Sequence, residues 1–176
     1  MWYRSAKKDA AGDISGDGTV FIAIWLPIEA RKMFDHIDDL LDDLHMTVVF
    51  ITGGIDSILK RRQVLDAVEE VCGRTPPIDC KLTELGIMGN EEKTLVANVT
   101  VMDGSKFYSD LIDTIQKKIG KDVERTYDFL PHVSLKEGGE PANIKDLRKF
   151  GWTAREVTVQ FEMDGFKHRF RFKGKG

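Results

Sequence analysis

The chain has 176 residues, 41% hydrophobic and 31% charged, which is typical of a folded globular protein of one domain or two small fused lobes. Its formal net charge of −3 argues against a general nucleic-acid coat, which needs a broad basic field, but leaves room for a local basic groove. The longest apolar run, Val20 to Ile28, is interrupted by Pro27 and is far shorter than the ~18 residues that a membrane span needs.

Residues 1–18 are polar, and we predict a loosely ordered N-terminal tail in front of a single domain at residues 19–176. The start of the chain carries charge but no apolar segment of the kind that a signal peptide contains. Cys72 and Cys80 have no metal-type spacing and make no disulfide framework, so we expect free thiols. Together these features predict a cytoplasmic protein with no membrane partner.

The first half of the domain alternates strand and helix patterns. A continuous apolar run at 19–26 predicts a buried strand, which Pro27 ends. Helical spacing of the next apolar residues predicts a helix at roughly 29–43. These residues are Ala30, Met33, Phe34, Ile37, Leu40, Leu41 and Leu44. A strand at 44–50 follows, closed by Gly53 and Gly54, and a second helix is expected at about 57–72.

The second half repeats this order. We predict strands at 78–88 and 94–102, a helix at 103–120, a strand at 129–136 closed by two glycines, a helix at 142–150, and a hairpin of strands at 156–163 and 166–173. The hairpin is indicated by Asp164-Gly165, a strong two-residue turn signal. Strand, helix, His-containing strand, Gly-Gly and helix therefore occur twice, at 20–72 and at 95–150, although the two halves show no clear sequence identity.

Two of the predicted strands carry a histidine followed two residues later by a hydroxyl. One contains His45 and Thr47, and the other contains His132 and Ser134, preceded by Pro131. Because side chains alternate faces along a strand, each histidine shares a face with its hydroxyl. The core-facing residues would be Met46, Val48 and Phe50 in the first strand, and Val133 and Leu135 in the second.

Two such strands side by side would form a symmetric site of four side chains. Each imidazole can take or give a proton near neutral pH. Each hydroxyl can donate a hydrogen bond to a non-bridging phosphate oxygen. The pattern therefore favours opening or cleavage of a phosphodiester, with one histidine as base and the other as acid. The alternative for either motif alone is a half-buried structural histidine.

The paired motifs His45-x-Thr47 and His132-x-Ser134 resemble those of the 2H phosphoesterase superfamily, which includes 2′-5′ RNA ligase-like proteins and cyclic nucleotide phosphodiesterases. Ser134 stands where threonine is commoner and supplies the same hydroxyl. The resemblance implies an α+β fold with a bilobal pseudo-twofold duplication. Each lobe would have an antiparallel sheet with outer helices, and a central cleft would hold the four residues.

The function that this resemblance implies is a metal-independent phosphodiesterase without a cofactor. Its substrates would be 2′,3′-cyclic nucleotides, 2′-5′ oligonucleotides or cyclic oligonucleotide signals, and the resemblance also allows the reverse ligation. His45 and His132 would be catalytic, while Thr47 and Ser134 would bind the phosphate. We expect a monomer whose partner is a nucleotide or short oligonucleotide, with RNA as a further partner. The alternative is a non-catalytic nucleotide- or RNA-binding module with the same cleft.

Several other side chains are candidates for contact with substrate. Lys136 continues the face of His132 and Ser134 if the strand stays regular, and its alternative is a solvated strand end. Tyr127, Phe129 and Trp25 could stack a base, although core packing is the alternative for each.

Two charged segments each have a structural and a functional interpretation. The aspartates around His36, at positions 35, 38, 39, 42 and 43, suggest a metal-dependent phosphatase, but a solvated acidic helix face fits them better. The last strand alternates between two faces. Phe166, His168, Phe170 and Phe172 share one face, and Lys167, Arg169, Arg171 and Lys173 share the other. We predict a packed, structural His168 and a basic edge that blocks sheet aggregation, with guidance of an RNA backbone as the alternative.

Overall fold

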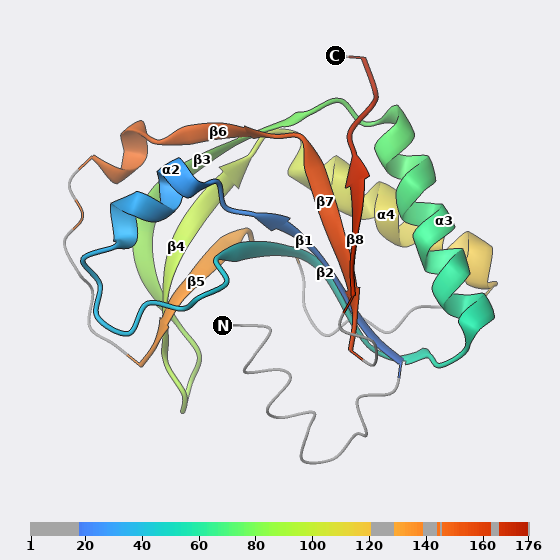
Figure 1. The fold of residues 1–176 in the computed structure, drawn as a ribbon, viewed down its shortest axis with the longest axis horizontal. Helices are drawn as coiled ribbons and strands as arrows, with labels where there is room; N and C mark the ends of the chain where they lie inside the picture. Colours follow the sequence, from blue (N-terminus) through green and yellow to red (C-terminus); the bar gives the residue numbers. More distant parts are fainter. Residues whose placement is uncertain (1–17, 121–128, 139–143, 145, 163–165, 176) are drawn as a thin grey trace.

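A computed structural model describes residues 18–120, 129–138, 144, 146–162 and 166–175 (Figure 1). Its centre is an eight-stranded sheet in the order β6-β3-β4-β5-β2-β1-β7-β8, in which neighbouring strands are antiparallel. The strands are β1 (Gly18–Trp25), β2 (His45–Ile55), β3 (Ile78–Met88), β4 (Thr94–Val101), β5 (His132–Glu137), β6 (Gly151–Ala154), β7 (Glu156–Phe161) and β8 (Lys167–Arg171). The predicted α+β class and antiparallel pairing are confirmed.

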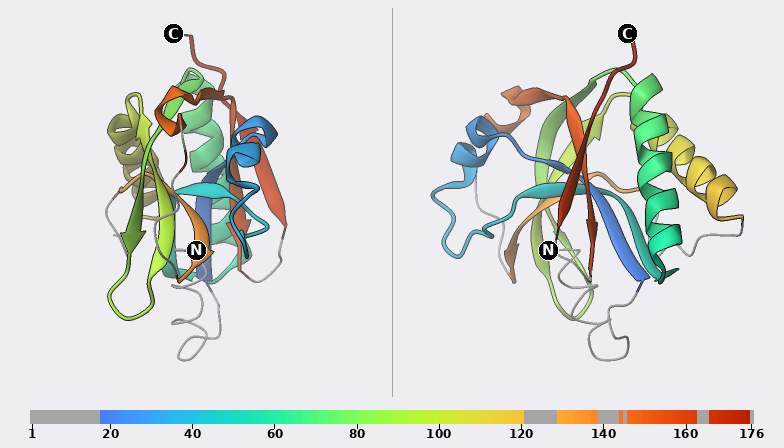
Figure 2. Two further views of the ribbon diagram at one scale, coloured as in Figure 1. Left: turned by 90° about the vertical axis from the view of Figure 1, so that its left-hand side faces the viewer. Right: turned by 45° about the vertical axis from the view of Figure 1, so that its right-hand side comes forward.

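Two long helices lie side by side at one end of the sheet (Figures 1 and 2). They are α3 (Ile58–Arg74) and α4 (Gly104–Ile119), each within a few residues of its prediction. The side chain of Ser57 caps α3 by accepting from the backbone N–H of Lys60, and α4 ends at Gly120, whose φ of 79° suits glycine. Neither helix, nor any other helix in the described ranges, is long and apolar enough to cross a membrane.

The middle of the sheet is the junction between β2 and β5. The strands β1, β2, β7 and β8 lie on one side of this junction, and β3, β4, β5 and β6 lie on the other. Both His-containing strands are therefore central and adjacent. The sequence suggested a separate sheet in each of two lobes. The structure instead has one continuous sheet, in which β2 and β5 connect the two halves.

The predicted helix at 29–43 is wrong. The described segment is one short helical turn, α2 (Ile28–Arg31), followed by the 3-10 turn η1 (Lys32–Phe34) and then by loop. Five aspartates weaken helix formation here because their side chains compete for backbone hydrogen bonds, and Asp39 has a φ of 58°. Apolar spacing still marked buried residues, since Phe34, Ile37, Leu41 and Leu44 are all in the core.

The segment after β5 also differs from its prediction. Residues 142, 143 and 145 lie outside the described residues, and the described part holds only the 3-10 turn η2 (Leu147–Lys149) of the helix expected at 142–150. The following strand β6 was missed because its four residues are too short for a periodic pattern. The hairpin strands β7 and β8 are confirmed as an antiparallel pair, while their turn at 163–165 lies outside the described residues.

A bulge in β2 sets which residues reach the core. Ile22 lies opposite Val49, but Ala23 lies opposite Thr47, so β2 has one extra residue, Val48. Val48 and Val49 are consequently both in the main core. The expectation that Phe50 faces this core is wrong: it packs with Phe21 and Ala23 in a separate small cluster.

Candidate active site

The two motifs meet around a single residue pair. Met46 of β2 lies opposite Val133 of β5, and both side chains are fully buried in the main core. His45 and Thr47 flank Met46, and His132 and Ser134 flank Val133. Because faces alternate along each strand, these four residues share the face that points away from the main core. The antiparallel register then places His45 beside Ser134 and Thr47 beside His132.

His45 begins β2 and sits among aromatic rings. Its centroid is 5.1 Å from that of Trp25 and 5.6 Å from that of Phe21, both on the neighbouring β1. The ring is half-buried, and its Nδ1 is 3.1 Å from the backbone oxygen of Asp43. Burial lowers the pKa of His45 to about 4, and the positive charge of Lys167 acts in the same direction. This histidine is therefore neutral near neutral pH.

His132 has a matching environment at the start of β5. Its side chain is 4% exposed, and its Nδ1 lies 2.6 Å from the backbone oxygen of Leu130. Burial lowers the pKa of His132 below its ordinary value, while the bond to Leu130 works against this shift. Each motif histidine thus contacts the carbonyl of the residue two places before it.

These two hydrogen bonds select one tautomer for both rings. A carbonyl oxygen can only accept, so Nδ1 of His45 and of His132 carries the proton. In a neutral ring Nε2 then carries the lone pair and can act as a base. In a protonated ring Nε2 carries hydrogen and can act as an acid. Nε2 is therefore the atom that takes up or gives a proton in both rings.

The hydroxyl residues are buried beside the histidines, with Thr47 8% and Ser134 9% exposed.

Sequence reasoning missed a further polar neighbour, Asn98 of β4, which lies opposite His132 and is half-buried. Its signal was present in the sequence. Leu95, Ala97, Val99 and Val101 alternate toward the core, which leaves Asn98 as an amide on the opposite face.

Trp25 and Lys167 extend this face beyond His45. The Nζ of Lys167 lies 4.1 Å from the centroid of the Trp25 ring, which is within range of a cation–π interaction. Trp25 lies opposite His45 in the strand pairing and is half-buried. The tryptophan ring therefore contacts a motif histidine and a cation from β8, an arrangement that the spacing of these residues in the sequence did not indicate.

The remaining predicted contacts have different outcomes. Ser134 lies opposite Val96 but Lys136 lies opposite Leu95, so β5 is irregular just before Lys136 and the regular alternation of faces is broken there. A role for half-buried Lys136 stays a prediction. Tyr127 lies outside the described residues. Phe129 packs on Tyr108 of α4, with centroids 5.4 Å apart, and is therefore part of the core packing.

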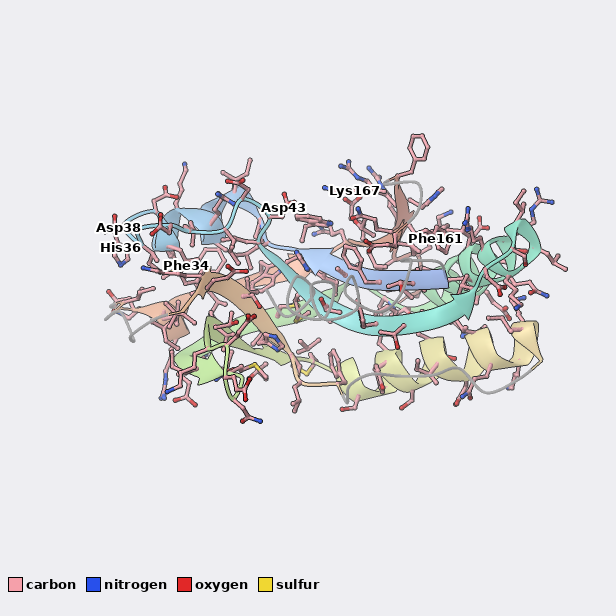
Figure 3. All side chains as sticks on the ribbon, turned by 90° about the horizontal axis from the view of Figure 1, so that it is seen from below. Phe34, His36, Asp38, Asp43, Phe161 and Lys167 are labelled. Atoms are coloured by element: carbon pink, nitrogen blue, oxygen red, sulfur yellow. The ribbon has the colours of Figure 1, made fainter. Side chains whose placement is uncertain are left out.

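The other two histidines lie elsewhere. His36 and the aspartates at 35, 38, 39, 42 and 43 are exposed, and Figure 3 shows His36 and Asp38 at the outer end of their loop. Across the described ranges, no three His, Cys, Asp or Glu side chains are placed to hold a metal ion. His168 packs edge-to-face against Phe161, with centroids 5.8 Å apart, as a structural histidine would.

A cavity of about 430 Å³ lies away from the motif residues, near the C-terminal end of α3 and the N-terminal end of α4. It is lined by Arg74, Thr75, Pro76, Pro77, Ile78, Asp79, Met102, Asp103, Lys106, Phe107 and Asp110. None of the four motif residues lines this cavity. Arg74 already forms an ion pair with Asp110 at 2.5 Å, and no histidine or thiol is among the described residues that line the space. The motif face, with its two histidines and two hydroxyls, is the better candidate for chemistry.

Comparison with known proteins agrees with this assignment. Residues 20–165 match the family model described as the 2′-5′ RNA ligase superfamily. The chain therefore belongs to the 2′-5′ RNA ligase superfamily, the 2H phosphoesterases, as its motifs predicted. Sequence comparison with curated proteins finds no significant match.

Solved structures share the fold at low sequence identity. The TT0787 protein of Thermus thermophilus has a TM-score of 0.65 and 14% identity, over 90% of this chain and 100% of that chain. LigT of E. coli has a TM-score of 0.57 and 19% identity, over 88% and 94%. Usb1 of Kluyveromyces marxianus, solved with uridine monophosphate, has a TM-score of 0.52 and 9% identity, over 89% and 99%. LigT has also been solved with 3′-AMP.

Proposed function

We propose that this protein is a metal-independent phosphodiesterase that hydrolyses 2′-linked or cyclic nucleotide phosphodiesters by paired-histidine acid–base catalysis. The observation that carries the proposal is the pairing of Met46 with Val133, which brings both His-x-Thr/Ser motifs to one face. Membership of the superfamily supports a phosphoesterase or nucleotide-binding role. The nucleotides bound by LigT and Usb1 support a nucleotide as the substrate.

The two histidines differ in the roles that they fit best. Burial lowers the pKa of His45 to about 4, so His45 is the ring that stays neutral and serves as the general base. Its Nε2 takes a proton from the attacking water as the water oxygen bonds to phosphorus. His132, in its protonated form, donates the Nε2 proton to the leaving oxygen as the phosphorus–oxygen bond breaks. The products are a phosphate monoester and a free hydroxyl.

Thr47 and Ser134 bind the non-bridging phosphate oxygens. Their hydroxyls donate hydrogen bonds to charge that increases in the transition state, and they are already fixed by the strands before substrate binds. Burial of both side chains makes each such bond stronger than it would be in water. Asn98 is placed beside His132 to contribute a further amide donor.

The strand pairing supports an internal duplication, although the helices do not repeat, because short turns link β1 to β2 whereas α4 lies between β4 and β5. β1 pairs with β2 and β4 pairs with β5, and each of these two pairs contributes one histidine strand to the centre of the sheet. We attribute this arrangement to a pseudo-twofold repeat of two lobes with the substrate cleft between them. Such a repeat explains why both histidines use the same backbone hydrogen bond at the same position in their strands.

In this proposal the protein is a cytoplasmic monomer without a cofactor. It acts on a nucleotide or a short oligonucleotide, and RNA is the polymer that it is expected to bind. Lys136 and Tyr127 remain proposed contacts to substrate.

Turnover of a 2′,3′-cyclic mononucleotide with an excess of chelator tests the proposal. All acid, base and donor groups in the mechanism come from side chains, so hydrolysis should continue at an unchanged rate. Loss of activity in chelator, restored by a divalent ion, would instead indicate a metal-dependent phosphatase. Tight nucleotide binding with no turnover of cyclic nucleotides or 2′-5′ oligonucleotides would indicate the binding module.

A further inference from the structure

The motif face continues across the sheet to its outer strand. Thr47 lies opposite Ala23, Ala23 lies opposite Thr158, and Thr158 lies opposite Arg169. Directly opposed residues in antiparallel strands project from the same face. The side chain of Arg169 therefore shares a face with Thr47, three strands away. Lys167 and Arg171 share this face with Arg169 because they are two residues away along β8.

Lys167 reaches from this outer strand toward the histidine. Its ammonium lies 4.1 Å from the Trp25 ring centroid, and that centroid lies 5.1 Å from the His45 ring. In Figure 3 Lys167 and Asp43, whose carbonyl contacts His45, both lie toward the top of the view, while α4 lies toward the bottom. Because the Trp25 ring already holds the Lys167 ammonium in place, this side chain loses less conformational freedom on binding an anion than an unrestrained lysine would.

The two ends of the sheet differ in charge. The edge strand β8 has the sequence Lys-His-Arg-Phe-Arg, and its three cations are exposed on the motif face. The opposite edge strand β6 has the sequence Gly-Trp-Thr-Ala and carries no charge. A polyanion bound at the two histidines is therefore attracted toward β8 more than toward β6.

No ion pair joins Lys167, Arg169 or Arg171 to a carboxylate in the described parts of the chain, although Glu156 lies opposite Arg171 in the strand pairing and on the same face. Protection of an exposed edge against aggregation explains why charges occur on β8. This protective role does not explain why the Lys167 side chain lies against the Trp25 ring, beside His45.

We propose that Lys167, continued by Arg169 and Arg171, forms a second phosphate subsite, so that the preferred substrate is an oligonucleotide running from the histidines across β1 and β7 to β8. This inference rests on the proposed function. Lys167 would contact the phosphate next to the reacting one on the His45 side, and the two arginines would contact phosphates farther along. A cyclic mononucleotide would reach the histidines but not this subsite.

Equilibrium binding of product-type probes tests the subsite without requiring turnover. The probes are a single-stranded RNA tetranucleotide with a 3′-phosphate and the mononucleotide 3′-AMP. The variants are Lys167→Gln and the pair Arg169→Gln with Arg171→Gln. The matched control is the pair Arg62→Gln with Lys117→Gln, which removes two cations from α3 and α4. Lys167→Arg keeps the charge and the contact with the ring.

Lys167→Gln should weaken tetranucleotide binding about three- to tenfold, as expected for one solvent-exposed hydrogen-bonded contact, and change 3′-AMP binding less than about twofold. The slope of log affinity against log salt concentration should become shallower by about 0.7 per lost phosphate contact. The arginine pair should behave similarly, while Lys167→Arg and the helix control should match the wild type.

Equal weakening of both probes by Lys167→Gln, or unchanged binding of both, would overturn the second subsite. A helix control that weakens the tetranucleotide as much as the β8 variants would also overturn it, because only net charge would then matter. Wild-type protein that binds neither probe would contradict the proposed function itself and the subsite with it.

Discussion

Met46 and Val133 lie opposite each other where β2 meets β5, with both side chains inside the core. This pair sets the register of two central strands that come from opposite halves of the sequence. A slip of one residue in either strand would turn its histidine toward the core and its apolar residues toward the opposite face. Burial of the two apolar side chains therefore also aligns the two motifs with each other.

Removal of the hydroxyl of Thr47 should slow catalysis more than it weakens binding. Thr47→Val keeps the shape of the side chain but loses the donor to the phosphate, and the loss of one transition-state donor costs about 10²–10³ in kcat. Thr47→Ser should keep most of the activity. Steady-state kinetics on a 2′,3′-cyclic nucleotide measures both effects.

Thr158→Val is the matched control for this experiment. Thr158 is also a buried threonine on the motif face, but it lies two strands away from Thr47. Its replacement should leave kcat within about twofold of wild type. A folded Thr47→Val protein with wild-type kcat would show that its hydroxyl does not stabilise the transition state.

The pH profile of kcat/KM should be bell-shaped with its maximum on the acidic side of pH ~6.5, the ordinary pKa of histidine. The reaction needs one neutral and one protonated histidine, and burial lowers the pKa of both rings, that of His45 to about 4. The acidic limb should therefore fall near the pKa of His45. Lys167→Gln removes a positive charge that lowers this pKa, so its acidic limb should move to higher pH. An acidic limb that is identical in the two proteins would contradict this coupling.

The free energy of unfolding should decrease as the pH falls from about 6.5 to about 4. In this window His45 takes up a proton in the unfolded chain but stays neutral in the folded protein. The contribution of His45 to stability is therefore fully present above the unfolded-state pKa and is lost as the pH falls toward the folded-state pKa. His45→Gln should reduce the difference between urea unfolding curves at about pH 7 and about pH 4.5. His36→Gln, at an exposed position, serves as the control. An unchanged pH difference in His45→Gln would contradict burial of a neutral ring.

The sequence predicted most elements of the sheet because their patterns were local. Alternation in β3 and β4, the apolar run of β1 and the stripes of α3 and α4 each reflect burial on one face. The helix expected at 29–43 failed because Phe34, Ile37 and Leu41 are buried by a loop that tertiary contacts hold in place. Arg31 donates to the backbone oxygen of Asp42, and the N–H of Leu41 donates to Leu135 on β5.

The motif residues could be found from sequence, but their surroundings could not. Period-two alternation paired each histidine with its hydroxyl, yet the bulge at Val48 and the irregularity before Lys136 depend on how neighbouring strands pair. The contact of Lys167 with Trp25 joins residues 142 positions apart (167 − 25), and no local pattern encodes it. Alternation along β4 does predict Asn98, because it places this amide on the face opposite the core.

The central claim is that His45 and His132 act together in one proton-transfer event. His45→Ala, His132→Ala and the double variant should be compared at saturating substrate, after circular dichroism shows that each is folded. Each single variant should lose about 10²–10⁴ in kcat, and the double variant should lose far less than the product of the two single effects. His36→Ala and His168→Ala should remain active. A folded His45→Ala or His132→Ala protein with near wild-type turnover would contradict the paired-histidine mechanism.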